Sequence, residues 1–368
     1  MAETATEGAG TVLLTGFPGF LGERLLPRLL ELRPGARCCC LVQPKFQPLA
    51  EAALDRLEAR HHQVRERVEI VPGDITEERL GLAPDATSRL QRDITGCFHL
   101  AAVYDLAVRR DVAMRVNVDG TRNLLRFLQE ARAFERLDYV STAYVSGAAT
   151  GFFRETDLDV GQRFKNFYEE TKFLAEVAVV QSGLPHAVYR PGIVVGDSRT
   201  GETAKFDGPY FALTAMTRLP SPGLFVRIGS GRNTVNLVPS DFVIEALARL
   251  STSVGATGRV YHLTDPNPVT TLEIETLFAQ ALGKHFAYAP VPKWLAKVLF
   301  SPAAIQRFFG MPVQTIDYFD HPCLYDATQA TQALGAFGLS CPRFPDYVGR
   351  LVDFYVRKRG ALRTAAMA

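Results

Sequence analysis

Residues 11–26, TVLLTGFPGFLGERLL, decide the fold, because a short apolar run passes through three glycines into a helix-like repeat. The glycines Gly16, Gly19 and Gly22 stand three residues apart at this junction. Glycine permits a tight turn, lets a ligand approach the backbone and lets the helix pack closely on the strand. The helix N-terminus then presents N–H groups and a positive dipole to phosphates. A tight turn that binds nothing is the competing interpretation, but three glycines exceed what a turn needs, so the stretch predicts a dinucleotide-binding loop.

Strand-like and helix-like segments alternate from this stretch to about residue 197. The later strand patterns are apolar on successive residues rather than on every second residue, which indicates strands buried on both faces. The alternation therefore predicts an α/β fold, a Rossmann-type doubly wound parallel sheet. The expected later strands lie within residues 36–43, 68–74, 96–102, 136–147 and 186–196.

The alternation ends after about residue 197, where a loop-like segment rich in Gly and Pro begins, and the last hundred residues are mixed and mostly helical. We therefore expect a smaller, mixed or helical substrate domain beside the sheet. The predicted nucleotide-binding domain comprises residues 10–200, with a segment at about 235–265 returning to it. The predicted substrate-binding and C-terminal domain comprises residues 201–234 and 266–368.

Composition excludes several classes of protein. The formal net charge is only +2 and no basic block occurs, so nothing favours a nucleic-acid partner. The six cysteines include no C-x-x-C pair, which argues against a zinc site or a disulfide framework and favours reduced thiols. The first ten residues, MAETATEGAG, lack the features of a signal peptide, and no apolar run reaches ~18 residues. We therefore expect a cytoplasmic protein without a metal.

The segment after the second strand bears on the choice of nicotinamide cofactor. An acidic residue ~20 positions past the first glycine would bind the ribose hydroxyls of NAD. No acid occurs between Glu31 and Glu51, while Arg37 and Lys45 are nearby cations. A missing acid and an available cation favour NADP(H), with Lys45 as the candidate phosphate ligand, and leave NAD(H) as the alternative.

Tyr168 and Lys172 lie four residues apart in KNFYEETKFLAE, a helix-like stretch at 165–176, and so share one helix face. A phenol with an ordinary pKa of ~10 is a poor proton donor and acceptor at neutral pH, but a nearby ammonium favours its ionised form. Upstream, Ser141 and Thr142 stand at the predicted end of the fifth strand. A hydroxyl at that edge of the sheet can donate to a substrate carbonyl, and either residue could equally cap local backbone.

The order of these motifs resembles that of the extended short-chain dehydrogenase/reductase superfamily over roughly the first 265 residues. The resemblance rests on the glycine loop, VPGD with Asp74, HLAA at 99–102, NVDGT from Asn117, STAYV at 141–145, the Tyr-x-x-x-Lys pair and YRPG from Tyr189. It implies that Thr142, rather than Ser141, joins Tyr168 and Lys172 in a catalytic triad.

The same resemblance assigns cofactor contacts. Asp74 and Ile75 would border the adenine, Ala101 and Ala102 would line the middle of the cofactor, and Pro191 would lie near the nicotinamide end. His99 and Asn117 are expected to be structural rather than catalytic. The predicted cofactor-binding residues are Gly16, Gly19, Phe20, Leu21, Gly22, Lys45, Asp74, Ile75, Ala101, Ala102, Tyr168, Lys172 and Pro191.

Within the superfamily the sequence looks similar to the thioester reductase and fatty acyl-CoA reductase branch, of the male-sterility type. TGFPGFLG, YEETKFLAE, YRPGIVVGDSRTGET and FDGPYF carry this likeness. It implies an NADPH-dependent reductase that transfers hydride to the carbonyl of an apolar acyl thioester or fatty aldehyde. The alternatives are a 3β-hydroxysteroid dehydrogenase-like enzyme, a nucleotide-sugar epimerase or dehydratase, and a dinucleotide-sensing protein without catalysis.

The most apolar part of the C-terminal region is PKWLAKVLFSPAAIQRFFG at 292–310. It is compatible with the wall of a lipid pocket, with a peripheral membrane contact and with a helix pair in a domain core. The sequence leaves the oligomeric state open, with a homodimer among the options. The apolar residues concerned are Trp294, Leu295, Val298, Leu299, Phe300, Phe308 and Phe309.

Overall fold

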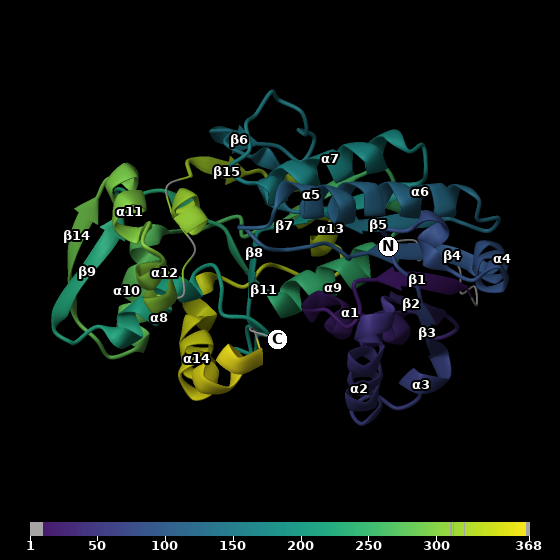
Figure 1. The fold of residues 1–368 in the computed structure, drawn as a ribbon, viewed down its shortest axis with the longest axis horizontal. Helices are drawn as coiled ribbons and strands as arrows, with labels where there is room; N and C mark the ends of the chain where they lie inside the picture. Colours follow the sequence, from purple (N-terminus) through teal and green to yellow (C-terminus); the bar gives the residue numbers. More distant parts are fainter. Residues whose placement is uncertain (1–9, 310, 312, 320, 366–368) are drawn as a thin grey trace.

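The computed structural model describes residues 10–309, 311, 313–319 and 321–365, and a seven-stranded parallel sheet forms its centre (Figure 1). The strand order is β12-β7-β5-β4-β1-β2-β3, so it reverses between β1 and β4. A doubly wound sheet opens its ligand crevice at such a reversal. The sheet confirms the predicted fold class. Its strands are β1 (Thr11–Thr15), β2 (Arg37–Val42), β3 (Val68–Pro72), β4 (Ile94–His99), β5 (Arg136–Val140), β7 (His186–Pro191) and β12 (Val260–Leu263).

Helices cover both faces of this sheet, which explains why its strands read as unbroken apolar runs. In β2, Cys38 and Cys40 pack on one helix layer while Cys39 packs on the other. Figure 1 shows the layer of α6 and α7 above the sheet and that of α1 and α9 below it. The first layer contains α4 (Pro84–Asp93), α6 (Gly120–Gln129) and α7 (Phe167–Gln181); the second contains α1 (Phe20–Leu32), α2 (Gln47–Glu58), α9 (Ser240–Leu250) and α13 (Thr328–Gly335).

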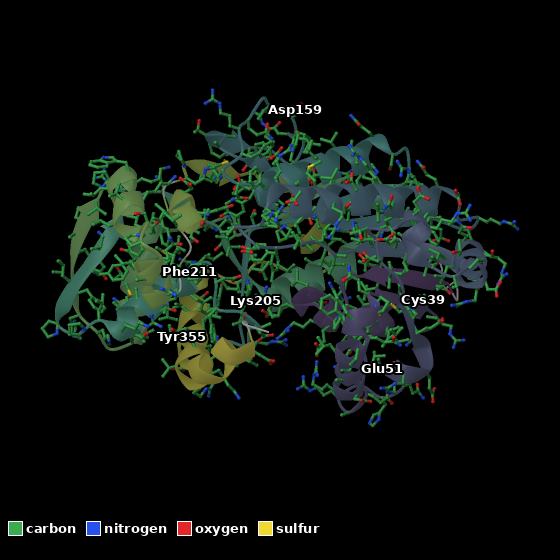
Figure 2. All side chains as sticks on the ribbon, in the orientation of Figure 1. Cys39, Glu51, Asp159, Lys205, Phe211 and Tyr355 are labelled. Atoms are coloured by element: carbon green, nitrogen blue, oxygen red, sulfur yellow. The ribbon has the colours of Figure 1, made fainter. Side chains whose placement is uncertain are left out.

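A separate hydrophobic core lies in the group of elements at the left of Figure 1. Tyr210, Phe278 and Phe344 are among its fully buried residues. Figure 2 shows Lys205 between this group and the sheet. The group comprises α8 (Tyr210–Arg218), β9 (Gly223–Ile228), α10 (Thr271–Ala281), β14 (Phe286–Val291), α11 (Lys293–Phe300), α12 (Ala303–Phe309) and α14 (Phe344–Ala365).

Short elements connect these parts. They are η1 (Pro44–Phe46), α3 (Val64–Arg67), η2 (Glu78–Gly81), α5 (Arg110–Ala113), η3 (Met114–Asp119), η4 (Ala143–Ser146), β6 (Gly151–Phe153), β8 (Ile193–Val195), β10 (Thr234–Val235), β11 (Leu237–Pro239), η5 (Val254–Ala256), β13 (Val269–Thr270), η6 (Val313–Tyr318) and β15 (Cys323–Tyr325). Two of them, β8 and β11, form a parallel pair. Strand β8 carries the chain from the sheet towards the second core, and β11 brings it back.

Helix α9 and strand β12 both lie against the sheet domain. Helix α9 packs on α1, and β12 pairs with β7 at the edge of the sheet. Helix α13, from the C-terminal region, also packs on α9 and β12. We propose that residues 10–200, with a segment at about 235–265, form the nucleotide-binding domain. Residues 201–234 and 266–368 would then form the substrate-binding and C-terminal domain. Helix α13 belongs to the second range in sequence but packs on the first domain.

One predicted strand is divided. The apolar run at 186–196 forms β7 and β8, which are separated by Gly192. A Cβ at Gly192 would lie 2.7 Å from the carbonyl oxygen of Asn236, so the chain passes another segment too closely for a side chain. Because β8 pairs with β11 rather than with the central sheet, the run leaves the sheet at this glycine.

The apolar C-terminal stretch forms α11 and α12, and one side of α11 is open. Trp294 is 67% exposed and Val298 59% exposed, whereas Ala296 is buried. The predictions for the side chains of Phe308 and Phe309 lie outside the described residues. In the part of the chain that the structure describes, no helix combines the length and apolar character needed to cross a membrane.

Candidate active site

The predicted site residues follow the carboxyl ends of six strands, so they meet at one edge of the sheet. The glycine loop follows β1, Lys45 follows β2, and Asp74 with Ile75 follows β3. Ala101 and Ala102 follow β4, Thr142 follows β5, and Pro191 ends β7. Helix α7 supplies Tyr168 and Lys172. This edge is where parallel α/β sheets bind their ligands.

The glycine loop is too closely packed for side chains. Gly16 has φ +92°, and a Cβ there would lie 2.9 Å from the backbone nitrogen of Ala101. A Cβ on Gly19 or on Gly22 would approach the carbonyl oxygen of Gly16 to 2.6 Å. Helix α1 begins at Phe20, followed by Leu21, so the first-turn N–H groups face the end of the loop. The cradle that these glycines leave fits the pyrophosphate of a dinucleotide.

A polar contact absent from the sequence predictions closes the far end of this edge. Gln43, the first residue after β2, donates from Nε2 to Oδ2 of Asp74 at 2.8 Å. The other oxygen of Asp74 accepts from the backbone N–H of Thr76 at 2.9 Å, while Ile75 is buried. Lys45 is exposed, and its Nζ lies 4.8 Å from the ring centroid of Phe46. Gln43 therefore occupies the position after β2 at which an acidic residue would bind the ribose hydroxyls of NAD.

Below Ala101, a buried chain of hydrogen bonds joins β1 to β4. The Ala101 N–H donates to Oγ1 of Thr15, which lies 2.7 Å from Nδ1 of His99. The other ring nitrogen of His99 lies 2.9 Å from Oγ1 of Thr121, whose hydroxyl donates to the Asn117 carbonyl. Burial lowers the pKa of His99 to about 3, so the ring is neutral and donates from Nε2. The predicted packed role of His99 is confirmed.

Asn117 connects the segment after β4 with the helix of the tyrosine–lysine pair. Its Oδ1 accepts from the Val103 N–H at 2.8 Å, and its Nδ2 donates to Oγ1 of Thr171 at 3.0 Å. Helix α7 itself begins at Phe167 because the Asn166 side chain accepts from the Glu169 N–H. Asn117 therefore holds the segment after β4 against α7 through these two hydrogen bonds.

Thr142 and Tyr168 are brought together at the strand edge. Thr142 lies at the N-terminus of η4, where its Oγ1 accepts from the Tyr144 N–H at 3.3 Å. Burial raises the pKa of Tyr168, and the nearby hydroxyl of Thr142 acts in the opposite direction. Tyr104 packs its ring edge-on against Tyr168, with 5.1 Å between centroids. The pair thus places two hydroxyl groups side by side, and the phenol is protonated at neutral pH.

Lys172 lies one turn further along α7 and is buried. Its Nζ donates to the hydroxyl of Tyr139 and to the carbonyl of Val140, each at 2.8 Å. Burial lowers the pKa of Lys172 to about 7, and the carboxylate of Glu176 opposes that shift. The ammonium therefore titrates near neutral pH instead of remaining charged throughout.

Ser141 and Pro191 take different places. The Ser141 hydroxyl donates to buried Glu176, so it is occupied away from Tyr168. Pro191 is buried at the end of β7, next to Arg190, whose guanidinium also contacts Glu176. Sequence reasoning missed Gln43, Tyr104 and Glu176 as parts of the site. Only Glu176 carried a signal, since it lies on the helix face of Tyr168 and Lys172.

Comparison with known families and structures places this geometry among reductases. The family model of the NAD-binding domain described as "Male sterility protein" matches residues 14–247. Glycine betaine reductase ATRR of Emericella nidulans is 32% identical over 283 residues, which are 72% of this chain and 22% of that protein. Fatty acyl-CoA reductase wat of Drosophila melanogaster is 27% identical over 271 residues, 64% of this chain and 53% of that one. The chain thus spans only part of the length of these relatives.

A solved structure resembles 95% of the chain. The terminal R domain from the myxalamid PKS-NRPS biosynthetic pathway superposes with a TM-score of 0.80 at 27% sequence identity. The superposition covers 95% of this chain and 91% of that domain. Both the sheet and the second group of elements are therefore shared with that R domain.

Proposed function

The chain belongs to the NAD-binding male sterility protein family, thioester and fatty acyl reductases of the extended short-chain dehydrogenase/reductase type, and we propose that it reduces an apolar acyl thioester or fatty aldehyde with NADPH. The observation that carries the proposal is that the hydroxyl of Thr142 lies close enough to Tyr168 to lower the pKa of its phenol, at the carboxyl edge of the sheet and with Lys172 one helical turn away. A nicotinamide cofactor, when bound, supplies the hydride.

Thr142 and Tyr168 handle the carbonyl oxygen in this proposal. Their hydroxyl groups donate hydrogen bonds to the oxygen as negative charge develops on it. Tyr168 is then the proton donor, because burial raises its pKa and keeps the phenol protonated at neutral pH. With an aldehyde, hydride at the carbonyl carbon and this proton give the alcohol. With a thioester, the carbon–sulfur bond breaks after hydride addition, and an aldehyde and a thiol result.

Lys172 is the proposed ligand of the cofactor ribose, and its amine contacts Tyr139 and Val140 rather than Tyr168. Two of its three N–H groups are used by Tyr139 and Val140 within the described part of the chain. The third can donate to a ribose hydroxyl of the cofactor. The rigid anchoring of the amine on β5 fixes the direction of that donor.

Support for NADPH over NADH comes from the end of β2. The position that would hold a ribose-binding carboxylate is Gln43, whose amide is held by Asp74. Lys45 lies two residues further, exposed, and no ion pair to it occurs among the described residues. A phosphate on the adenosine ribose would meet a cation there instead of an acid.

A substrate panel tests the proposed function. NADPH oxidation is followed with acyl thioesters, fatty aldehydes, glycine betaine, ketosteroids and nucleotide sugars, since the betaine reductase is a relative. Turnover of thioesters or fatty aldehydes is the expected result. Turnover of ketosteroids or nucleotide sugars alone would instead support the alternatives of the same superfamily, and tight NADPH binding without any turnover would support a sensing role.

A further inference from the structure

A buried carboxylate lies directly behind the candidate catalytic residues. Glu176 is on α7, one turn past Lys172, and its side chain is completely buried. Its Oε1 accepts from Nε and Nη2 of Arg190 at 2.9 and 2.6 Å. Its Oε2 accepts from the Ser141 hydroxyl at 2.5 Å. One carboxylate therefore joins α7 to β7 and to the residue that precedes Thr142.

Arg190 is itself fixed from its other side. Its Nη1 donates to Nε2 of His262 on β12 at 3.2 Å, and Nδ1 of that ring donates to the Asp326 carbonyl at 2.7 Å. Burial lowers the pKa of His262 to about 3, so the neutral ring can accept from the guanidinium. Glu155 accepts from the His262 N–H and from the first turn of α13. The pair is thus held by contacts from β12 and the C-terminal region.

Stability alone does not explain why a charged pair occupies this position. Removing two ions from water costs several kcal/mol, and apolar residues of similar volume often serve as well or better. What the ion pair adds is direction, because the planar guanidinium and the carboxylate fix one another in a single geometry. Arg190 thereby orients Glu176, which accepts from the Ser141 hydroxyl. Ser141 precedes Thr142 in the chain, and Glu176 lies one helical turn after Lys172.

We propose that Glu176 and Arg190 are positioning residues that set the distance between the strand end carrying Thr142 and the helix carrying Tyr168 and Lys172. Both side chains are almost completely buried, so in this proposal they act through their neighbours. The proposal rests on the proposed function for its kinetic readout and also has a readout independent of substrate.

The charge of Lys172 depends on the same pair. The titratable groups that face it are Tyr139 on β5, His99 on β4, and Tyr168 and Glu176 on α7, with Arg190 behind Glu176. His99 is neutral and so places no positive charge beside the amine. The carboxylate of Glu176 is the group that favours the charged form of Lys172. Glu176→Gln removes this effect and leaves the Arg190 cation nearby. The Lys172 pKa should then fall below about 7.

The mildest kinetic test is Ser141→Ala. This variant removes the strand-end link but keeps the Glu176–Arg190 pair, so the protein should fold. We expect kcat to fall about 10-fold or more, because small displacements between reacting groups are costly. KM and the NADPH dissociation constant should change little. An unchanged kcat in this folded variant would overturn the proposal.

The charged pair is tested by Glu176→Gln and by Glu176→Gln/Arg190→Gln. The single variant leaves a buried cation and should lose stability, whereas the double variant removes both charges and should regain it. Because it lacks the fixed geometry, the double variant should keep a low kcat. Recovery of kcat together with stability would contradict a positioning role. The matched control is Glu275→Gln, which breaks the buried pair with Arg227 outside the sheet domain and should leave Lys172 unaffected.

The readout independent of substrate is the titration of Lys172. The chain has eight lysines, so NMR of lysine-labelled protein can follow each one. In Glu176→Gln, the Lys172 signal should titrate at lower pH than in the wild type, and in Glu275→Gln at the same pH. An unchanged Lys172 pKa in Glu176→Gln would overturn the proposal even if the wild type reduced none of the panel. Inactivity of the wild type with a shifted Lys172 pKa would reject only the proposed function.

Discussion

Ser141 and Thr142 are consecutive residues with hydroxyl groups committed to different partners. The Ser141 hydroxyl donates to buried Glu176, whereas Thr142 accepts from the Tyr144 N–H and lies close enough to Tyr168 to lower the pKa of its phenol. The residue types alone leave either hydroxyl possible, and the family resemblance predicts Thr142. The structure separates them by their positions along α7, because Glu176 lies two helical turns past Tyr168. This division underlies the proposed roles of Thr142 in substrate binding and of Ser141 in positioning.

Tyr168→Phe should abolish reduction while it leaves cofactor binding nearly intact. The variant removes only the proton donor, and the ring can keep its packing against Tyr104. A general acid contributes about 10²–10⁴-fold to the rate, so kcat should fall by at least that range. The measurement is steady-state NADPH oxidation beside a fluorescence titration with NADPH. Full activity in Tyr168→Phe would reject the proposed triad.

Lys45→Glu should reduce the preference for NADPH over NADH. An introduced carboxylate repels a phosphate on the adenosine ribose and can accept from the ribose hydroxyls of NADH. We expect the ratio of the two dissociation constants to shift by about 10-fold or more, as loss of a charge-assisted contact implies. Since Lys45 is exposed, stability should hardly change. Tighter binding of NADH than of NADPH by the wild type would refute the cofactor proposal.

The sheet could be predicted because local pattern and global fold agree along β1, β2 and β4. The Cys38–Cys40 run indicates a strand covered on both faces, and the three glycines mark the edge where the ligand lies. The close contacts at Gly16, Gly19 and Gly22 exclude side chains, so these positions require glycine at a fixed spacing of three residues. These sequence features are therefore sufficient to predict the fold class and the position of the glycine loop.

The polar contacts behind the site leave no such spacing. Gln43 meets Asp74 across 31 positions, and Glu155 accepts from backbone N–H groups of α13 across 174 and 175 positions. Each pairing depends on how two segments cross in space, and hydrophobic periodicity does not report it. The same limit explains why the sequence did not predict that α13 packs on the sheet domain.

Gly22→Ala should weaken dinucleotide binding because the loop cannot accept a methyl group. The added Cβ would lie 2.6 Å from the Gly16 carbonyl oxygen, so helix and loop must move apart. Overpacking of this kind costs about 1–3 kcal/mol of stability. Gly96→Ala on β4 is the matched control, since its Cβ would lie at an ordinary 3.8 Å from the Arg136 carbonyl. Thermal unfolding and NADPH titration of both variants test this, and equal behaviour would contradict it.

Trp294 offers a direct test of whether α11 meets an apolar substrate. It is the single tryptophan and is 67% exposed, so its emission should be that of a solvated indole and open to quenchers. An acyl chain bound along α11 should shift the emission to shorter wavelength and protect it from quenching. Trp294→Ala should change stability by no more than about 0.5 kcal/mol. Emission unaffected by a turned-over long-chain substrate would show that the substrate lies elsewhere.

The lowered pKa of Lys172 predicts how stability depends on pH. The folded protein holds this amine with a pKa of about 7, against 10.5 for an ordinary lysine. Between those values the unfolded chain binds more protons, so the contribution of Lys172 to stability rises with pH. The destabilising effect is complete below the folded pKa and disappears above the unfolded one.

Lys172→Met removes this contribution while it keeps an apolar chain of similar length. The variant should gain stability relative to the wild type at about pH 6, on the order of a few kcal/mol, and much less at about pH 10. Denaturant unfolding of both proteins at the two pH values measures this difference, with far-UV circular dichroism as the probe. A stability difference that does not change with pH would mean that Lys172 keeps an ordinary pKa in the folded protein.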